Sequence, residues 1–255
     1  MRSIAALALA ATMLTACATA DGGAPAAIAA PDAHAAIMAA IADPLRPAAD
    51  TARDANRKPM EALTFAGVKP GDYVAELAPG GGWYTRLLAR AVGPNGHVYA
   101  LVSPAQAQRP GGLDAINALA AQYGNVTVVP TDYTAMTLPR PVDLVWTTEN
   151  WHDFHNGPTA NPTGIAKAAF AALKPGGIFF IEDHAAAAGA GTSVTQTLHR
   201  IEPAAVISEV TSAGFRLDAQ GDYLRHPADD HTAGVRDSSV QGVTDKLALR
   251  FRKPR

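Results

Sequence analysis

The sequence has a single cysteine and little charge of either sign. Cys17 stands near the N-terminus, so the rest of the 255-residue chain contains no thiol for a disulfide or a cysteine-based metal site. Charged residues make up 17% of the chain, and the formal net charge is -2. Lysines and arginines are scattered rather than clustered, so the basic patch that nucleic-acid binding requires is missing. We therefore expect no nucleic-acid partner.

Long hydrophobic runs are also scarce, and the clearest one lies at the N-terminus. Residues 1–17 read MRSIAALALAATMLTAC, with Arg2 before an apolar stretch that is too short to span a bilayer as a mature helix. This pattern predicts a secretory signal. The letters LTAC at residues 14–17 resemble a bacterial lipoprotein cleavage site, in which the cysteine is acylated and becomes the new N-terminus. A plain cleaved signal with an incidental cysteine is the alternative interpretation.

These features predict a cellular location and a division of the chain. We expect residues 1–17 to be a lipoprotein signal, residues 18–35 a flexible tether rich in alanine, glycine and proline, and residues 36–255 one α/β domain. The alanine after Cys17 favours, by resemblance, the outer membrane. The protein would then be exported and periplasmic, attached to the membrane through a lipid on Cys17. No pattern indicates the oligomeric state.

Apolar runs alternate with helical patterns through the rest of the chain. Short apolar runs without strict alternation are typical of parallel strands that are covered on both faces. We expect strands at 73–77, 97–102, 126–130, 142–148 and 176–184, with helices between them. Two further strands, after Gly214 and from Asp245, follow one another without a helix. The order predicts a Rossmann-like, doubly wound, mostly parallel seven-stranded sheet with a C-terminal antiparallel strand pair at its edge.

A glycine loop follows the first predicted strand. The letters ELAPGGGWYT at residues 76–85 place three glycines between this strand and the next helix. Open α/β sheets bind ligands at this carboxyl edge, and glycine lets the backbone approach a ligand closely. A Walker-type phosphate loop would need Lys and then Ser or Thr after Gly82, and a dinucleotide loop would need glycine at Thr85. Both phosphate-binding interpretations are therefore disfavoured.

The spacing Glu76-x-Ala78-x-Gly80-x-Gly82 resembles motif I of the class I S-adenosylmethionine-dependent methyltransferases, with alanine in place of the first glycine. VTVVPTDYTAMTLP, VDLVWTTENWHDF and LKPGGIFFIEDH resemble later segments of the same family. More narrowly, RDANRKP, GGGWYT, HRIEPAAV and AGF are similar to a bacterial group of exported predicted methyltransferases. The resemblance runs from about Arg53 to the C-terminus. It implies S-adenosylmethionine as the cofactor and methyl transfer to a small-molecule acceptor.

The resemblance also implies cofactor contacts. The glycine loop would pass close to the methionyl part, and Asp132 would face the adenine amino group. The family usually has an acidic residue at the end of the second strand, bonded to the ribose hydroxyls, whereas this chain has Leu101, Val102 and Ser103 there. Ser103 or a neighbouring loop would have to substitute. The implied contacts are Glu76, Ala78, Pro79, Gly80, Gly81, Gly82, Tyr84, Thr85, Ser103, Asp132, Tyr133 and Glu149.

Titratable side chains follow the fourth and fifth predicted strands, which would bring them to the same edge of the sheet. Methyl transfer to a hydroxyl or amine needs aligned reactants and a base for the acceptor's proton. His152, Asp153, Asp183 and His184 are therefore the candidate catalytic residues. His152 is our first choice of base because histidine titrates near neutrality. A hydrogen bond from His152 to a loop backbone is an equally good interpretation.

Two other functions stay open. His152, His155 and Asp183 offer nitrogen and oxygen ligands for zinc or iron, which would make the chain a metal-dependent hydrolase or lyase, although His-x-x-His spacing is common by chance. The missing carboxylate after the second strand, and the need for cofactor outside the cytoplasm, favour instead a non-catalytic protein that binds another small ligand or a protein partner. The site prediction itself contains no metal ligand.

Several aromatic and basic residues have two interpretations each. Trp83, Tyr84 and Trp151 could stack on adenine or substrate, but the helical spacing of the first two also suits core packing. The basic residues of the segment RDANRKP could hold an anionic acceptor over the site. An exposed charged helix face is the other explanation for them.

Overall fold

The computed structural model describes residues 32–255, and these belong to one compact unit. Cys17, the signal and most of the tether lie outside the described residues. Helix α1 (Ala33–Ile41) begins inside the expected tether, because the Asp32 side chain accepts a hydrogen bond from the backbone N–H of Ala35 and caps the first turn. None of the helices in this part of the chain is long and apolar enough to span a bilayer.

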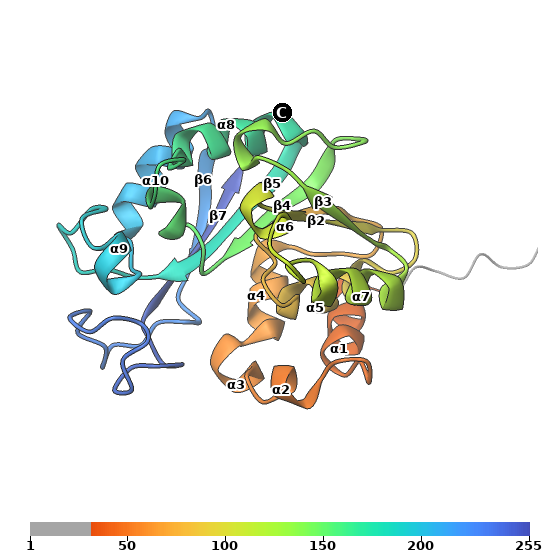
Figure 1. The fold of residues 1–255 in the computed structure, drawn as a ribbon, viewed down its shortest axis with the longest axis horizontal. Helices are drawn as coiled ribbons and strands as arrows, with labels where there is room; N and C mark the ends of the chain where they lie inside the picture. Colours follow the sequence, from red (N-terminus) through yellow and green to blue (C-terminus); the bar gives the residue numbers. More distant parts are fainter. Residues whose placement is uncertain (1–31) are drawn as a thin grey trace, which may run out of the picture. The chain divides into compact units, whose positions relative to one another are not determined.

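One seven-stranded sheet runs through the described residues, in the order β3-β2-β1-β4-β5-β7-β6 (Figure 1). Strands β1 to β5 pair in parallel, and β7 is antiparallel to both β5 and β6. The predicted doubly wound sheet with an antiparallel pair at its edge is confirmed. The strands are β1 (Tyr73–Leu77), β2 (His97–Val102), β3 (Val126–Pro130), β4 (Val142–Thr148), β5 (Leu173–His184), β6 (Arg216–Gly221) and β7 (Lys246–Arg252).

Strand β5 starts earlier than the sequence predicted. The letters KPGG suggested a turn before Gly176, whereas the structure keeps Leu173 paired with Val142. The register of β4 and β5 shifts between Val142 and Leu144, so a bulge accommodates the extra residues. Helix α8 therefore passes directly into β5.

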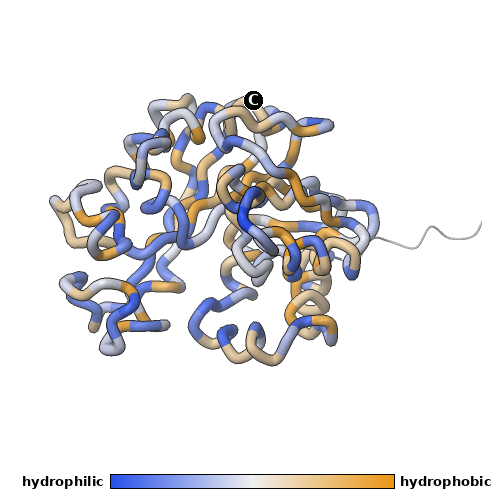
Figure 2. Tube along the Cα trace, viewed as in Figure 1, coloured by the Kyte–Doolittle hydropathy of each residue, from blue (hydrophilic) through white to orange (hydrophobic). Residues whose placement is uncertain are grey.

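Helices cover both faces of the sheet, as the non-alternating strands predicted. On one face, α1, α4, α5 and α7 contribute to one hydrophobic cluster; on the other, α8 and α10 contribute to a second. In Figure 2 the strands in the middle of the sheet are largely hydrophobic, whereas α3 is hydrophilic. The other helices are α2 (Ala48–Thr51), α3 (Asp54–Arg57), α4 (Pro59–Ala66), α5 (Trp83–Val92), α6 (Pro104–Ala107), α7 (Asp114–Tyr123), α8 (Pro162–Ala172), α9 (Thr195–Leu198) and α10 (Pro203–Ser212).

The strand order reverses between β1 and β4. Strand β2 follows β1 in the chain and lies on one side of it, whereas β4 lies on its other side. Loops that leave the carboxyl ends of β1 and β4 therefore diverge and leave room between them, which is where open α/β sheets bind ligands. The glycine loop and the ENWHDF segment are these two loops.

Candidate functional site

The glycine loop turns through left-handed backbone conformations. Ala78, Gly80 and Gly82 have φ values of 52°, 57° and 82°. Alanine is strained in this region by roughly 1–2 kcal/mol, whereas glycine is not. The replacement of the first motif glycine by Ala78 is therefore a costly departure, because the backbone needs a positive φ at this position.

The three consecutive glycines have different roles. A Cβ atom on Gly82 would collide with Leu119 of α7, so Gly82 lets α5 and α7 pack closely. By contrast, no described atom lies within 4 Å of the Cβ position at Gly80 or Gly81. Of the two, only Gly80 needs a positive φ. Neither the backbone conformation nor the packing therefore requires glycine at position 81, and the missing side chain leaves open space there.

That space belongs to a cavity of about 240 Å³ between the glycine loop, the end of β4 and helices α2 and α3. It brings together seven of the predicted cofactor residues, which are Glu76, Ala78, Pro79, Gly80, Gly81, Tyr84 and Glu149. The other lining residues are Asp50, Arg53, Arg57, Trp83, Thr148 and Asn150. Five predicted cofactor residues do not line it, namely Gly82, Thr85, Ser103, Asp132 and Tyr133.

Glu149 sits between two cations at the wall of this cavity. Its carboxylate lies 2.8 Å from the Arg57 guanidinium and 2.5 Å from the Lys246 ammonium. Burial acts to raise the pKa of Glu149, but Lys246 and Arg57 outweigh burial and hold it well below its usual range. Glu149 also has a left-handed φ of 56°, which marks a strained position. The carboxylate is therefore ionised and already neutralised by the protein.

Arg57 was expected on an exposed charged face or over the site, and the structure buries it. Its guanidinium lies over the rings of Trp83 and Tyr84, at 4.6 and 5.0 Å from their centroids. Both rings belong to the hydrophobic core, so they pack there and hold the arginine. Trp151 is likewise fully buried, and its indole N–H donates to Glu209.

Two carboxyl groups of the sheet are buried, that of Glu76, which lines the cavity, and that of Glu182. Glu76 accepts a hydrogen bond of 2.6 Å from the Thr85 hydroxyl, and Glu182 accepts one of 3.1 Å from the Tyr84 hydroxyl. Burial raises the pKa of each to about 7. The hydroxyls of Thr85 and Tyr84 are thus used inside the protein, and both carboxyl groups change their protonation near neutral pH.

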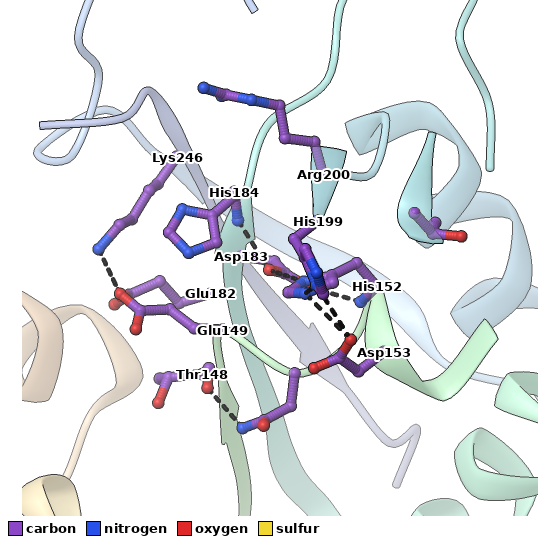
Figure 3. A network of polar contacts seen from close by, with 12 residues as sticks. Thr148, Glu149, His152, Asp153, Glu182, Asp183, His184, His199, Arg200 and Lys246 are labelled. Carbon is purple, nitrogen blue, oxygen red and sulfur yellow. Dashed lines mark hydrogen bonds and ion pairs between the residues drawn. The ribbon is translucent and has the colours of Figure 1, made fainter. Parts of the chain in front are cut away.

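His152 forms a buried pair with Asp183 (Figure 3). Its Nδ1 lies 2.7 Å from Asp183 Oδ1, and its backbone N–H donates to Asp183 Oδ2 at 2.7 Å. Because Asp183 is fully buried and accepts from Nδ1–H, the network places the lone pair of the neutral imidazole on Nε2. Burial acts to lower the pKa of His152, but the Asp183 carboxylate outweighs burial and raises it.

A second histidine meets this pair. His199 Nδ1 lies 3.3 Å from His152 Nε2, and Asp153 Oδ1 lies 3.4 Å from both nitrogens. Sequence reasoning did not single out His199, because it follows a four-residue helix and comes 47 positions after His152. The only sequence signal for it was the HRIEPAAV segment, which entered through the family resemblance.

The two remaining histidines of the sequence prediction, His184 and His155, contact different partners. His184 Nδ1 lies 2.8 Å from the Thr244 hydroxyl, and burial lowers the pKa of His184 to about 4, so its ring stays neutral. His155 Nε2 lies 3.2 Å from the Glu209 carboxylate. The structure therefore does not bring His155 into one metal-binding group with His152. Among the described residues, the group that could hold a metal ion is His152, Asp153 and His199.

Comparisons with known proteins identify the fold. No protein-family model and no curated protein matches the sequence. Solved structures do: an S-adenosylmethionine-dependent methyltransferase from Aquifex aeolicus shares 17% identity, with a TM-score of 0.54 over 78% of this chain and 97% of that one. The glycopeptide N-methyltransferase MtfA, solved with S-adenosylmethionine, shares 18% over 76% and 86% of the chains, with a TM-score of 0.52. The [4+2]-cyclase SpnF shares 15% over 88% and 97%, with a TM-score of 0.58. The chain has the class I methyltransferase fold.

Within this fold, the ends of β2 and β3 carry little that could bind a ligand. Ser103 accepts from the backbone N–H of Gln106 and caps α6, and Asp132 accepts from the backbone N–H and hydroxyl of Thr134. The Tyr133 hydroxyl lies against Ser103 and the backbone of Ala78. These three predicted cofactor residues thus satisfy one another or their own turns. The carboxylate expected after β2 has no replacement there.

Proposed function

We propose that the protein binds S-adenosylmethionine above the glycine loop and transfers its methyl group to a small-molecule acceptor. The observation that carries this proposal is the cavity at the point where the strand order reverses, lined by glycine-loop residues that leave it open. The shared fold with methyltransferases, one of them solved with this cofactor, supports the choice of ligand.

The residues around the cavity fit the methionyl half of the cofactor better than the adenosyl half. The loop from Ala78 to Gly81 offers backbone groups and open space. Asn150 fixes the loop, because its amide donates to the carbonyls of Ala78 and Thr148. On the adenosyl side, no carboxylate follows β2. We therefore expect weaker cofactor binding than an acidic residue at that position would allow.

His152 is the base in this proposal. When bound, the cofactor would supply an electrophilic methyl group on a positively charged sulfur. Nε2 of His152 would take the proton from the acceptor's hydroxyl or amine, and Asp183 would stabilise the imidazolium that forms. His184 stays neutral behind them. Against the effect of burial, the Asp183 carboxylate raises the pKa of His152, which makes Nε2 a stronger proton acceptor.

The test is calorimetric titration of the full chain with S-adenosylmethionine, repeated with Gly81→Ala and Gly81→Leu. Because Gly81 needs no positive φ and a Cβ there would meet nothing, Gly81→Ala should fold like the parent. Thermal unfolding checks that Gly81→Leu, whose side chain extends beyond Cβ, is folded as well. Micromolar binding that weakens from glycine to alanine to leucine would support the proposal. Absence of binding at millimolar cofactor, by a chain that unfolds cooperatively, would contradict it.

The proposal also includes an envelope location. The sequence of residues 1–17 supports export and acylation of Cys17, with attachment to the outer membrane. Labelling of cells with a radioactive fatty acid should mark the parent chain and leave the Cys17→Ser variant unlabelled. Label on both chains, or on neither, would contradict lipid attachment at Cys17.

A second candidate is a non-catalytic protein that uses the same cavity for another small ligand. The missing carboxylate after β2 favours it, and the similarity to SpnF, described as a [4+2]-cyclase, is a reminder that the fold does not fix the reaction. The two candidates differ in the cofactor titration. A ligand-binding protein would show no heat with S-adenosylmethionine although its cavity is intact.

A further inference from the structure

His152, Asp153 and His199 form a group that we call the histidine cluster. One side-chain atom from each of them borders a common point (Figure 3). His152 Nε2, His199 Nδ1 and Asp153 Oδ1 form a nearly equilateral triangle with edges of 3.3, 3.4 and 3.4 Å. Zinc binds histidine nitrogen and carboxylate oxygen at about 2.0–2.1 Å in tetrahedral sites, which places neighbouring ligand atoms about 3.3–3.4 Å apart. An octahedral ion with the same bond lengths would need edges of about 2.9 Å. The observed triangle therefore has tetrahedral dimensions.

The first ligand is held in the orientation that metal binding requires. Asp183 is fully buried and accepts from both the backbone N–H and Nδ1 of His152. A carboxylate on the far nitrogen of a histidine fixes the ring and its tautomer and makes the near nitrogen a better ligand. Nε2 thus presents its lone pair to the centre of the triangle.

The second ligand occupies a position where the backbone favours glycine. His199 ends α9 with a φ of 54°, a left-handed conformation in which a histidine is strained. The next residue, Arg200, is fully buried and holds Asp229 through two contacts of 2.8 and 3.1 Å. This anchor keeps the strained histidine beside His152.

We propose that His152, His199 and Asp153 bind one zinc-class divalent cation, with Asp183 orienting His152. The Asp153 side chain is 50% exposed and that of His199 28%, so the fourth position faces outward and remains open to water or a substrate. This inference does not depend on cofactor binding. If both hold, His152 serves as a metal ligand and not as the base, and the ion would lower the pKa of an acceptor hydroxyl at the fourth position, whose proton would pass to solvent water.

The test is zinc titration of the full chain, stripped of metal with a chelator and prepared without a histidine tag. The Cys17→Ser variant serves as the parent, because a cysteine thiol is a competing zinc ligand. We expect one zinc ion per chain by calorimetry. Cobalt in place of zinc should give the intense visible absorption of a tetrahedral site.

Three variants and one control, His155→Gln, locate the site. His199→Gly removes a ligand while it relieves the left-handed strain, and Asp153→Asn changes a half-exposed side chain, so both should fold; each should weaken zinc binding more than about 100-fold. Asp183→Asn should weaken it about 10–100-fold, as loss of an orienting carboxylate does. His155 pairs with Glu209 and is not a ligand in this proposal. His155→Gln should therefore change the zinc affinity less than twofold.

Two results would overturn the inference. One is a folded parent that binds no zinc, which would mean that His199 only donates a hydrogen bond to His152. The other is zinc binding that persists in His199→Gly, which would place the ion elsewhere.

Discussion

The carboxyl edge of the sheet is unequal in its two halves. The half formed by β2 and β3 ends in Ser103 and Asp132, whose side chains are used as local caps. The half formed by β4 and β5 carries Glu149, His152 and Glu182 together with Asp183 and His184, and receives Arg57, Lys246 and His199 from other elements. The half of the edge formed by β2 and β3 thus has no charge network among the described residues, whereas the half formed by β4 and β5 has a dense one.

This difference distinguishes the residues that hold the site together from the residues that a ligand could contact. On the dense side, Glu149 is neutralised by Arg57 and Lys246, so this network forms a wall of the cavity rather than a reactive group. Asp153 is different, because its side chain is 50% exposed and its carboxylate faces Nε2 of the buried His152 rather than a lysine or arginine. Both proposals therefore place the chemistry at the histidine cluster.

The largest expected effect comes from breaking the charge network. Lys246→Met leaves Glu149 and the fully buried Glu182 without their shared cation, so the free energy of unfolding should fall by about 3–5 kcal/mol. Lys174→Met is the matched control: Lys174 lies 2.7 Å from Asp143, but both side chains are partly exposed, and the loss should be about 1 kcal/mol or less. Urea unfolding measures both. Equal losses would show that the network does not support the fold.

The next effect is the pH dependence of the free energy of unfolding, which we assign to Glu76 in β1, a strand at the point where the strand order reverses. The folded pKa of Glu76 is raised to about 7, so the unfolded chain releases this proton first, and stability falls as the pH rises from about 4.5 to about 7. Glu76→Gln removes that fall, and its advantage over the parent should grow by roughly 3 kcal/mol across this range. Glu202→Gln is the control, because backbone N–H groups of Gly189 and Gly191 lower the pKa of Glu202, and its loss alters the profile only in acid. Parallel profiles for parent and Glu76→Gln would refute the assignment.

Most of the fold could be predicted from the sequence because its signals are local. Apolar runs for β1 to β4 matched the strand bounds, since parallel strands buried on both faces show continuous hydrophobicity. The start of β5 was missed because Leu173 is held by pairing with Val142, a contact that the letters KPGG do not reveal.

The site was less predictable because its contacts are distant in sequence. Strand order was enough to bring His152 next to Asp183, since His152 follows β4 and Asp183 lies near the end of the neighbouring parallel strand β5. The burial of Arg57 depends on Glu149 and on two aromatic rings, and the role of His199 depends on a left-handed turn after α9. Neither the segment DANRK nor the segment TLHR has a local sequence pattern that predicts these contacts.

The half formed by β2 and β3 can be altered to sharpen the contrast. Ser103→Asp keeps a side chain that caps α6 and adds a carboxylate after β2, where the family resemblance places the ribose-binding acid. Affinity for S-adenosylmethionine should rise about tenfold, which corresponds to one charge-assisted hydrogen bond of about 1.5 kcal/mol. Ser103→Asn, with the same shape and no charge, is the control. If the two variants bind equally, the cofactor's ribose does not lie at the end of β2.

The smallest effect lies where the two halves meet, at Ala78. Its φ of 52° costs the folded protein about 1–2 kcal/mol, whereas glycine avoids that cost but loses more entropy on folding, about 0.4–1 kcal/mol. Ala78→Gly should therefore raise the free energy of unfolding by about 0.5–1 kcal/mol. Ala120→Gly, in the regular helix α7, should lower it by about 1 kcal/mol. Opposite signs in urea unfolding would show that the loop carries strain, and a loss in both variants would show that it does not.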